Sequence, residues 1–464
     1  TVDFQEKLHL SIQMNTLGAL RVLALAHKSK HLEAMVHTST CYVNWARKGR
    51  DVPVKEELYP LSFDPEAMCK HILSLHESSI ASETERLLTM YNFPNTYTFT
   101  KSMAEHLIRK NKGKLPVTIV RPAIIGCSYR DPCPGWIDAL TAAGGLFLTV
   151  GLGIVNELQM NSKFIADLVP VDHVCNILLK ATFKTALHYR AAVVPSPSQP
   201  ERLPATPQAL VVPNKLGVAA LSTNAVNSVM SCPSPLLTMS TPNLAESVAT
   251  DIAFPFVFHA GTSSSLNALT WGICKEGVES FWNSGTRHPR AIGKANVYMS
   301  PNPIAFRVVH TVRQLIPFYA MKAASMLPPP IGSEKKRKLI AKYEKALNRA
   351  ADLRFQFSPF VQFEWVYDQS NMKFLDEGLP TKVQKDFTSD TYEINWWTYV
   401  QLYNYGMCKH IINSAEGRNP PVVPRSGAEA FARAKLQSST WGAIINFWIH
   451  FLSIHCCYNV FQKK

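Results

Sequence analysis

Cysteine chemistry has little support in this sequence. The ten cysteines contain no CxxC pair and no cysteine–histidine array with metal-ligand spacing. Apart from the neighbours Cys456 and Cys457 they are scattered, which is typical of free thiols in a reducing compartment rather than of a disulfide framework. His27 and His31 lie four residues apart on a predicted helix, but no third ligand accompanies them, so we expect no metal site.

Acidic residues are few compared with basic ones, and the formal net charge is +14. A basic balance suits nucleic acid, an anionic membrane surface or a polyphosphate ligand. The sequence has no zinc-finger, RNP-like or helix-turn-helix signature, so we expect no nucleic-acid binding. The densest basic run, Lys335 to Lys338, is interpreted as the solvated start of a helix.

A glycine-rich phosphate turn and an initial methionine are also missing. The nearest match is Gly151-Leu152-Gly153, which has Asn156 in place of a third glycine and no strand-to-helix turn after it. We therefore reject it as a dinucleotide site. The length of 464 residues and the 46% hydrophobic content suffice for two or three domains with real cores.

What the sequence does have is a tyrosine and a lysine four residues apart, Tyr97 and Lys101, on one face of a predicted helix. A phenol is a poor proton donor near neutral pH because its reference pKa is about 10. A fixed ammonium beside it favours the phenolate and lowers that pKa. Tyr97 would then protonate a carbonyl oxygen while a hydride reaches the carbonyl carbon. An ordinary surface pair is the alternative, and the same spacing recurs at Tyr405 and Lys409, where a loop follows.

Two predicted strands flank this helix. Residues 31–40 have the pattern of a short buried strand that ends in Ser39 and Thr40, and residues 115–120 have the pattern of another. The order strand, helix, strand predicts an α/β arrangement. It brings the two hydroxyl residues and the tyrosine–lysine pair to the carboxyl edge of a parallel sheet, where such folds bind ligands.

Four successive blocks resemble the fatty acyl-CoA reductases, a branch of the extended short-chain dehydrogenase/reductases. They are VHTSTCYVN (36–44), YTFTKSMAEHLI (97–108), LPVTIVRPAIIGCSYRDPCPGWID (115–138) and ADLVPVDHVCNILL (166–179). Residues 302–413 resemble the C-terminal helical domain of that family in their run of aromatic and basic residues.

The resemblance implies a Rossmann-type doubly wound parallel sheet, incomplete at its N-terminus, then a mainly helical C-terminal domain and a hydrophobic tail. The predicted helix at residues 8–26 corresponds to the one after the fourth strand, so the first three strands and the glycine-rich turn would precede residue 1. We expect the chain to be a fragment of a longer protein that cannot bind its cofactor as written.

The resemblance also implies site residues. Tyr97 and Lys101 would be catalytic and would contact the cofactor, NADPH. Ser39 is our first choice for the hydroxyl that hydrogen-bonds the substrate carbonyl, with Thr40 as the alternative. Asn15 matches an asparagine near the nicotinamide in related reductases, although it could equally satisfy backbone groups. Pro122 lies in a turn that runs along the nicotinamide ring.

The implied reaction is the NADPH-dependent reduction of long-chain fatty acyl-CoA to fatty alcohol with release of CoA. One alternative is another extended reductase that acts on a lipid or sterol carbonyl. The other, from a different class, is a catalytically inactive membrane-associated fragment. The intact Tyr97, Lys101 and Ser39 argue against the inactive fragment, whereas the missing phosphate turn argues for it.

We expect a reductase domain at 1–300, a helical domain at 301–415, a linker at 416–440 and a membrane-associating tail at 441–464. Residues 195–243 are rich in Pro, Ser, Thr and Ala, which predicts a disordered insertion. Within the tail, residues 441–461 have about the length of a membrane span but include polar side chains. Spanning and lying in the interface are both open, and a buried soluble helix is the third option. We expect the protein at the cytosolic face of the endoplasmic reticulum or the peroxisome.

Overall fold

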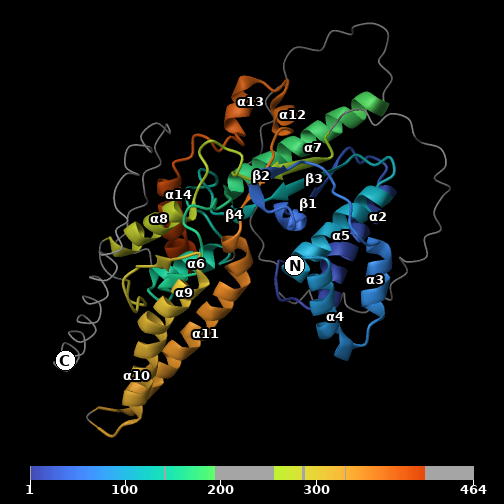
Figure 1. The fold of residues 1–464 in the computed structure, drawn as a ribbon. Helices are drawn as coiled ribbons and strands as arrows, with labels where there is room; N and C mark the ends of the chain where they lie inside the picture. The colour runs from blue at the N-terminus through green and yellow to red at the C-terminus, as the bar shows by residue number, and fades with distance from the viewer. Residues whose placement is uncertain (1, 141–142, 194–254, 285–287, 330, 413–464) are drawn as a thin grey trace, which may run out of the picture. The chain divides into compact units, whose positions relative to one another are not determined.

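The computed structural model describes residues 2–140, 143–193, 255–284, 288–329 and 331–412 (Figure 1). These residues belong almost entirely to one compact unit, Thr1–Tyr189 with Pro255–Lys464, whereas a second unit is Arg190–Phe254. The predicted insertion at 195–243 and the predicted linker and tail at 416–464 lie outside the described residues.

The central sheet is parallel and has the order β1-β3-β7, with bounds Met35–Thr38, Val117–Pro122 and Val257–Ala260. Met35 pairs with Val117, and Arg121 pairs with His259, so the three strands run in register toward one carboxyl end. Every residue of β3 is buried. A strand buried on both faces reads as a continuous apolar run, as VTIV does here.

One face of the sheet is covered by the helices α1 (Leu8–Ser11), η1 (Ile12–Thr16), α2 (Leu17–Lys28) and α5 (Thr96–Asn111). The helices α3 (Pro65–Ser74) and α4 (Glu77–Met90) pack against this group. Their shared apolar cluster includes Leu8, Ile12, Ile72, Leu87, Phe99 and Leu107. η1 is one turn of π-helix, which confirms a helix at residues 8–26 but with a widened turn inside it.

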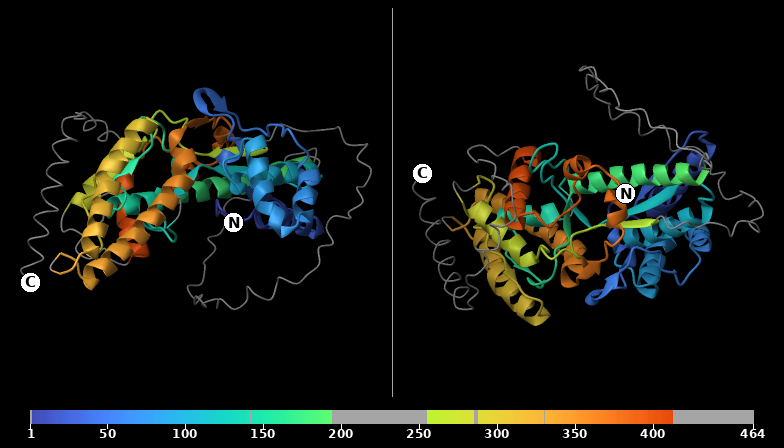
Figure 2. Two further views of the ribbon diagram at one scale, coloured as in Figure 1. Left: turned by 60° about the horizontal axis from the view of Figure 1, so that its bottom comes forward. Right: turned by 90° about the horizontal axis from the view of Figure 1, so that it is seen from above.

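The opposite face of the sheet is covered by α7 (Val171–Val193), since the hydroxyls of Thr118 and Thr185 lie 2.8 Å apart. Thr118 points to this face because side chains alternate along a strand, whereas Arg121 points to α5. The second view of Figure 2 shows α7 running along the sheet. Helices therefore cover both faces of a parallel sheet, which confirms the α/β class.

Three short pairs of strands complete the sheet structure, all of them parallel. β4 (Ile124–Gly126) pairs with β6 (Leu168–Pro170), β5 (Glu157–Leu158) with β8 (Tyr298–Met299), and β2 (Gly49–Val54) with β9 (Trp365–Tyr367). The last pair joins the N-terminal region to the C-terminal one. Beside it, Arg50 forms an ion pair of 2.7 Å with Glu364.

The C-terminal part is mainly helical, as predicted. Its elements are α9 (Pro303–His310), η4 (Thr311–Leu315), α10 (Ile316–Met326), α11 (Glu334–Gln362), α12 (Met372–Asp376), α13 (Thr381–Asp386), α14 (Trp396–Gly406) and η5 (Met407–Ile411). Before them come α6 (Ala143–Gly151) and α8 (Trp271–Asn283), and α8 packs on α14. Four aromatic residues of this part are buried in the core: Trp365, Trp396, Tyr399 and Tyr403.

Within the described ranges, no helix combines the length and the apolar character that a membrane crossing requires.

Candidate active site

The carboxyl end of β1 carries the two predicted hydroxyl residues. The strand ends at Thr38, and the backbone N–H of Ser39 still donates to the Val120 carbonyl at 2.7 Å. The Ser39 and Thr40 side chains are both buried. Thr40 then caps a short 3₁₀-helix, Cys41–Asn44, by accepting a hydrogen bond from Tyr42 N. The chain is therefore held on both sides of Ser39.

The helix α5 brings the tyrosine–lysine pair to this point. Its N-cap is Asn95, whose side chain accepts from Thr98 N at 2.9 Å, so the helix begins just before Tyr97. Lys101 lies one turn further, and its Nζ donates to the Thr38 carbonyl at 2.8 Å. The structure thus brings Ser39, Thr40, Tyr97 and Lys101 together at the end of β1.

Electrostatics in this site differ from our expectation for Tyr97. Burial raises the pKa of Tyr97 to about 12, and its hydrogen bond with Thr40 works in the opposite direction. Burial also lowers the pKa of Lys101, while Glu105 raises it. The lowering of the Tyr97 pKa that we expected from Lys101 is not found in this structure. The reason is that burial dominates and the Lys101 ammonium is engaged with a backbone carbonyl.

The two candidate hydroxyls have different surroundings. Thr40 hydrogen-bonds Tyr97, whereas Ser39 Oγ is buried and has no hydrogen-bond partner among the described residues. A buried hydroxyl without a partner costs free energy unless a ligand completes it. Ser39 is therefore suited to form a hydrogen bond with a bound ligand. Thr40 is suited to orient the Tyr97 side chain.

Asn15 and Pro122 belong to different elements, η1 and β3. Asn15 is on η1, is 5% exposed and donates to Thr100 Oγ1 at 3.2 Å. Ser11 also contacts Thr100, at 3.0 Å, so this polar group fastens the first helices to α5. Pro122 ends β3 and pairs with Ala260 at the carboxyl end of the sheet. The structure gives Asn15 a packing role that is independent of any cofactor.

Beneath α5 lies a buried row of charged and polar groups that was not predicted from the sequence. Arg121 and Glu105 are each 1% exposed and form a bidentate pair, Nε to Oε1 at 2.9 Å and Nη2 to Oε2 at 2.6 Å. Arg121 Nη1 lies 3.3 Å from His259 Nε2. Glu105 is two turns from Tyr97 on the same face of α5, a spacing that could have been noticed in the sequence.

His37 is a second residue that the sequence analysis did not single out. It lies on β1 two positions before Ser39, so the two side chains share a face of the strand. Burial and the nearby Lys101 lower the pKa of His37 to about 4. The imidazole is therefore neutral near pH 7, and its Nε2 has no hydrogen-bond partner among the described residues.

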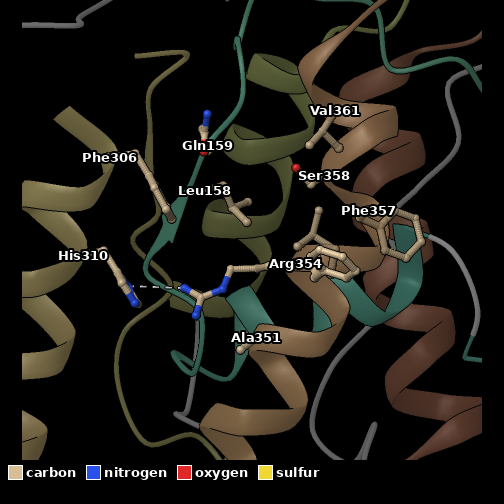
Figure 3. Close-up of a pocket in the computed structure, with 11 residues that line it drawn as sticks. Leu158, Gln159, Phe306, His310, Ala351, Arg354, Phe357, Ser358 and Val361 are labelled. Carbon is tan, nitrogen blue, oxygen red and sulfur yellow. Dashed lines mark hydrogen bonds between the residues drawn. The ribbon is translucent and has the colours of Figure 1, made fainter. Parts of the chain in front are cut away.

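An apolar cavity of about 240 Å³ lies between α9 and α11 (Figure 3). Its lining includes Leu146, Leu158, Phe306, Phe357 and Val361. Phe357 connects it to the tyrosine site, because the ring of Phe4 lies 6.2 Å from Phe357 and 5.7 Å from Tyr97. One wall is polar.

The polar wall belongs to a row of three polar side chains, Arg354, His310 and Glu157. Arg354 Nη1 lies 3.5 Å from His310 Nδ1, and His310 Nδ1 lies 3.2 Å from Glu157 Oε2. Glu157 is fully buried, and burial lowers the pKa of Arg354. Of these three residues, Arg354 and His310 line the cavity (Figure 3), and Gln159 and Ser358 also contribute polar groups to its lining.

The described residues hold no cluster of three or more potential metal ligands. Their polar groups fit the reactive end of a nicotinamide cofactor and a carbonyl substrate instead. The fit rests on the Ser39 hydroxyl, which has no hydrogen-bond partner among the described residues. It lies with the Tyr97 phenol and the Lys101 ammonium at the carboxyl end of a parallel sheet.

Comparisons with known proteins agree with this geometry. A family model for the NAD-binding part of the "Male sterility protein" matches residues 1–178, and a second model with the same description matches residues 313–414. Together they match more than half of the chain. These matches support a site for a nicotinamide cofactor.

The curated relatives that match are named fatty acyl-CoA reductases. Fatty acyl-CoA reductase 1 of Xenopus laevis is 26% identical over 473 residues, which are 98% of this chain and 76% of the frog protein. Fatty acyl-CoA reductase 1 of Homo sapiens is 26% identical over 415 residues, 89% of this chain but 65% of the human protein. Fatty acyl-CoA reductase 2 of Bos taurus is 24% identical over 476 residues, 98% of this chain and 76% of the bovine one.

Among solved structures, the terminal R domain from the myxalamid PKS-NRPS biosynthetic pathway matches with a TM-score of 0.42 at 12% identity. The match covers 88% of this chain and 66% of that one. The family models and the curated relatives decide the assignment. The chain belongs to the fatty acyl-CoA reductase family, whose models also carry the description of male sterility proteins.

Proposed function

We propose that the protein reduces long-chain fatty acyl-CoA to fatty alcohol with release of CoA and uses NADPH, on a Rossmann-type reductase fold. The observation that carries the proposal is the meeting of Tyr97, Lys101 and Ser39 at the end of β1, in a chain of this family. The choice of NADPH over NADH rests on family membership. Asn15 and Pro122 are proposed to hold the nicotinamide end of the cofactor, and Lys101 its ribose.

The bound cofactor supplies the hydride. Tyr97 donates its phenolic proton to the substrate oxygen on which negative charge develops. Its pKa of about 12 makes this donation inefficient unless the developing phenolate is stabilised. Thr40 provides one hydrogen bond, and Lys101 provides a positive charge at the end of β1. Ser39 donates a hydrogen bond to the substrate oxygen that Tyr97 protonates.

Two reductions separate a thioester from an alcohol, and the same side chains serve both. In the first, reduction at the thioester carbon gives a hemithioacetal, whose C–S bond then breaks to release CoA and leave an aldehyde. In the second, reduction of the aldehyde carbon is accompanied by a proton from Tyr97 to the oxygen, which gives the alcohol.

The acyl chain is proposed to run from Tyr97 past Phe4 and Phe357 into the cavity between α9 and α11. Ring contacts at 5.7 and 6.2 Å connect these positions, and the cavity lining is mostly apolar. The cavity of about 240 Å³ is smaller than an ordinary ligand pocket of roughly 300–1,000 Å³. It therefore suits the end of a chain rather than a whole acyl-CoA.

Membrane association through residues 441–464, at the cytosolic face of the endoplasmic reticulum or peroxisome, is proposed from sequence alone. The experiment is extraction of native membranes. Release that needs detergent supports insertion of this segment, whereas complete release by high salt refutes it.

The catalytic proposal is tested in membranes that contain the protein expressed from its full-length transcript, with palmitoyl-CoA and either NADPH or NADH. Gas chromatography should detect hexadecanol with NADPH, and Tyr97→Phe should lower its rate by about 10²–10⁴-fold. Tyr405→Phe is the matched control, because Tyr405 has the same spacing to Lys409 but lies on α14.

Each outcome bears on the proposal. A Tyr97→Phe protein that still forms alcohol at the wild-type rate would exclude Tyr97 as the acid. Reduction of a sterol ketone but not of palmitoyl-CoA would indicate a different lipid carbonyl, and no NADPH-dependent product would indicate an inactive protein. Micromolar binding of NADPH to the 464-residue chain would refute the expectation that this chain cannot bind the cofactor as written.

A second pair of variants distinguishes the two hydroxyls. Ser39→Ala removes the group without an internal partner, and Thr40→Val removes the partner of Tyr97. We expect Ser39→Ala to lower kcat at unchanged pH dependence. Thr40→Val should also move the basic limb of the pH–rate profile, because Thr40 contacts the titrating phenol.

A further inference from the structure

An apolar stripe runs along the outer side of the helix formed by α9, η4 and α10. From Ile304 to Tyr319 it recurs every three or four residues, which is the spacing of one helix face, and Met326 follows two turns later. Its members have exposed fractions between 41% and 70%: Ile304, Val308, Val312, Ile316, Tyr319 and Met326. The stripe continues into the loop before α11 with Leu327 and Ile331, and onto α11 with Leu339.

The inner side of the same helix holds the hairpin of α10 and α11 together. The ring of Phe318 lies 5.9 Å from that of Tyr343, and Lys322 pairs with Glu344 at 2.7 Å. Arg337 Nε donates to the Ser325 carbonyl at 3.1 Å. The stripe therefore contributes little to the packing of this hairpin. Figure 1 shows the loop between α10 and α11 at the end of the hairpin that lies away from the central sheet.

Charge around the stripe is mainly positive, because the acidic residues among 302–345, Glu334 and Glu344, form ion pairs with Lys338 and Lys322. Residues 302–333 contain no aspartate or glutamate but include Arg307, Arg313 and Lys322. The first turns of α11 add exposed lysines on the same hairpin: Lys335, Lys338, Lys342 and Lys345. Exposed apolar side chains flanked by lysines are the pattern of a helix that lies in the headgroup region of an anionic membrane.

We propose that the hairpin of α9, η4, α10 and the start of α11 is a docking surface for an anionic lipid bilayer. The stripe enters the boundary between headgroups and acyl chains, and the lysines contact lipid phosphates. An exposed apolar patch of this kind marks an interaction surface. The absence of acidic groups from residues 302–333 favours lipid phosphate over a protein surface of mixed charge.

The location of this surface agrees with the chemistry of the proposed substrate. Phe306 and His310, on the same helix, line the cavity proposed for the acyl chain, and the stripe residues Ile304 and Val308 alternate with them. Docking would bring that cavity close to the membrane. This link rests on the proposed function, whereas lipid binding itself does not.

The decisive experiment uses a photoreactive benzoylphenylalanine at the position of Ile316 in the full chain. The chain is mixed with vesicles of phosphatidylcholine and phosphatidylserine that carry radiolabelled lipid, and is then irradiated. Labelled lipid attached at position 316 supports the proposal. The matched control is the same side chain at Leu25, which is 68% exposed on α2 and should gain no lipid.

Other outcomes overturn the proposal. Crosslinks between two protein chains at position 316 would mean that a second copy covers the stripe. No crosslink at all would mean that the membrane does not contact it. Because the readout is local, a contribution from residues 441–464 to vesicle binding does not affect the result.

Charge is tested by the same crosslinking assay at position 316 in a chain that also carries the three substitutions Lys335→Gln, Lys338→Gln and Lys342→Gln. These side chains are exposed, so the fold should persist. With phosphatidylserine present, crosslinking at Ile316 should fall at least tenfold in this background, and raised salt should have the same effect on the parent. Equal crosslinking in the lysine variant and its parent would refute the role of the lysines. No substrate enters either assay, so failure here is distinguishable from failure of the proposed reaction.

Discussion

The buried pair of Arg121 and Glu105 allows a sharp prediction about stability. Both side chains are 1% exposed, and two hydrogen bonds of 2.9 and 2.6 Å connect them. Glu105→Gln keeps the shape of the carboxylate but leaves the Arg121 guanidinium without its counter-charge. Removal of one member of a buried ion pair costs about 3–5 kcal/mol, because the remaining charge is desolvated and unpaired.

The measurement is urea-induced unfolding followed by tryptophan fluorescence. Glu105→Gln should lower the free energy of unfolding by about 3–5 kcal/mol. Glu77→Gln is the control, because its pair with Lys7 is exposed to solvent and its removal should change the free energy of unfolding far less than Glu105→Gln does. The double variant Glu105→Gln, Arg121→Met should be more stable than Glu105→Gln alone, since it leaves no lone charge.

A loss of less than about 1 kcal/mol in Glu105→Gln would refute the reasoning, because it would equal the loss expected for an exposed pair. A double variant less stable than Glu105→Gln would also refute it, since the cost would then come from lost packing rather than from an unpaired charge. The Glu105→Gln protein also tests whether this ion pair supports the candidate active site, because Tyr97 and Lys101 lie on the same helix, α5.

Three further perturbations follow from the structure. A methyl group at Gly126 would overlap the Tyr399 hydroxyl, so Gly126→Ala should cost about 1–3 kcal/mol in urea unfolding, and unchanged stability would refute that crowding. At Gly18, inside α2, a Cβ would only meet a carbonyl oxygen at 3.6 Å, so Gly18→Ala should stabilise the protein by up to about 1 kcal/mol, and a loss would contradict this. Burial raises the pKa of Glu56 to about 7, so its contribution to stability is fully present below its ordinary pKa and is lost as pH rises through about 7. Glu56→Gln should flatten this decline in urea midpoints, and identical pH slopes for the variant and the parent would disprove it.

The local features of the site could be predicted from the sequence. Tyr97 and Lys101 lie on one helix face because the four-residue spacing fixes their direction, and the strand before Ser39 follows from its apolar residues. The helix at Lys335 to Lys338 was also predicted correctly, since Ser333 caps it and Glu334 begins it. The predicted domain boundaries at 300 and 415 stay a prediction.

Features that depend on distant residues could not be predicted. The sequence GRDVPV of β2 has no alternating apolar pattern, and its partner β9 lies more than 300 residues away. The contact of Thr40 rather than Ser39 with Tyr97 depends on how the chain turns after β1, which spacing does not determine. The raised pKa of Tyr97 depends on tertiary burial that includes Phe4.

The pairing of β2 with β9 has a consequence for how the protein is made. Gly49 can meet Trp365 only after the ribosome has synthesised most of the chain, so β2 waits unpaired while the segments between them fold. Contacts so distant in sequence slow folding, because a long loop must close before they form. A nascent chain that stops before Trp365 should therefore still expose the backbone of Gly49–Val54, which stays an unpaired strand edge until β9 has been synthesised.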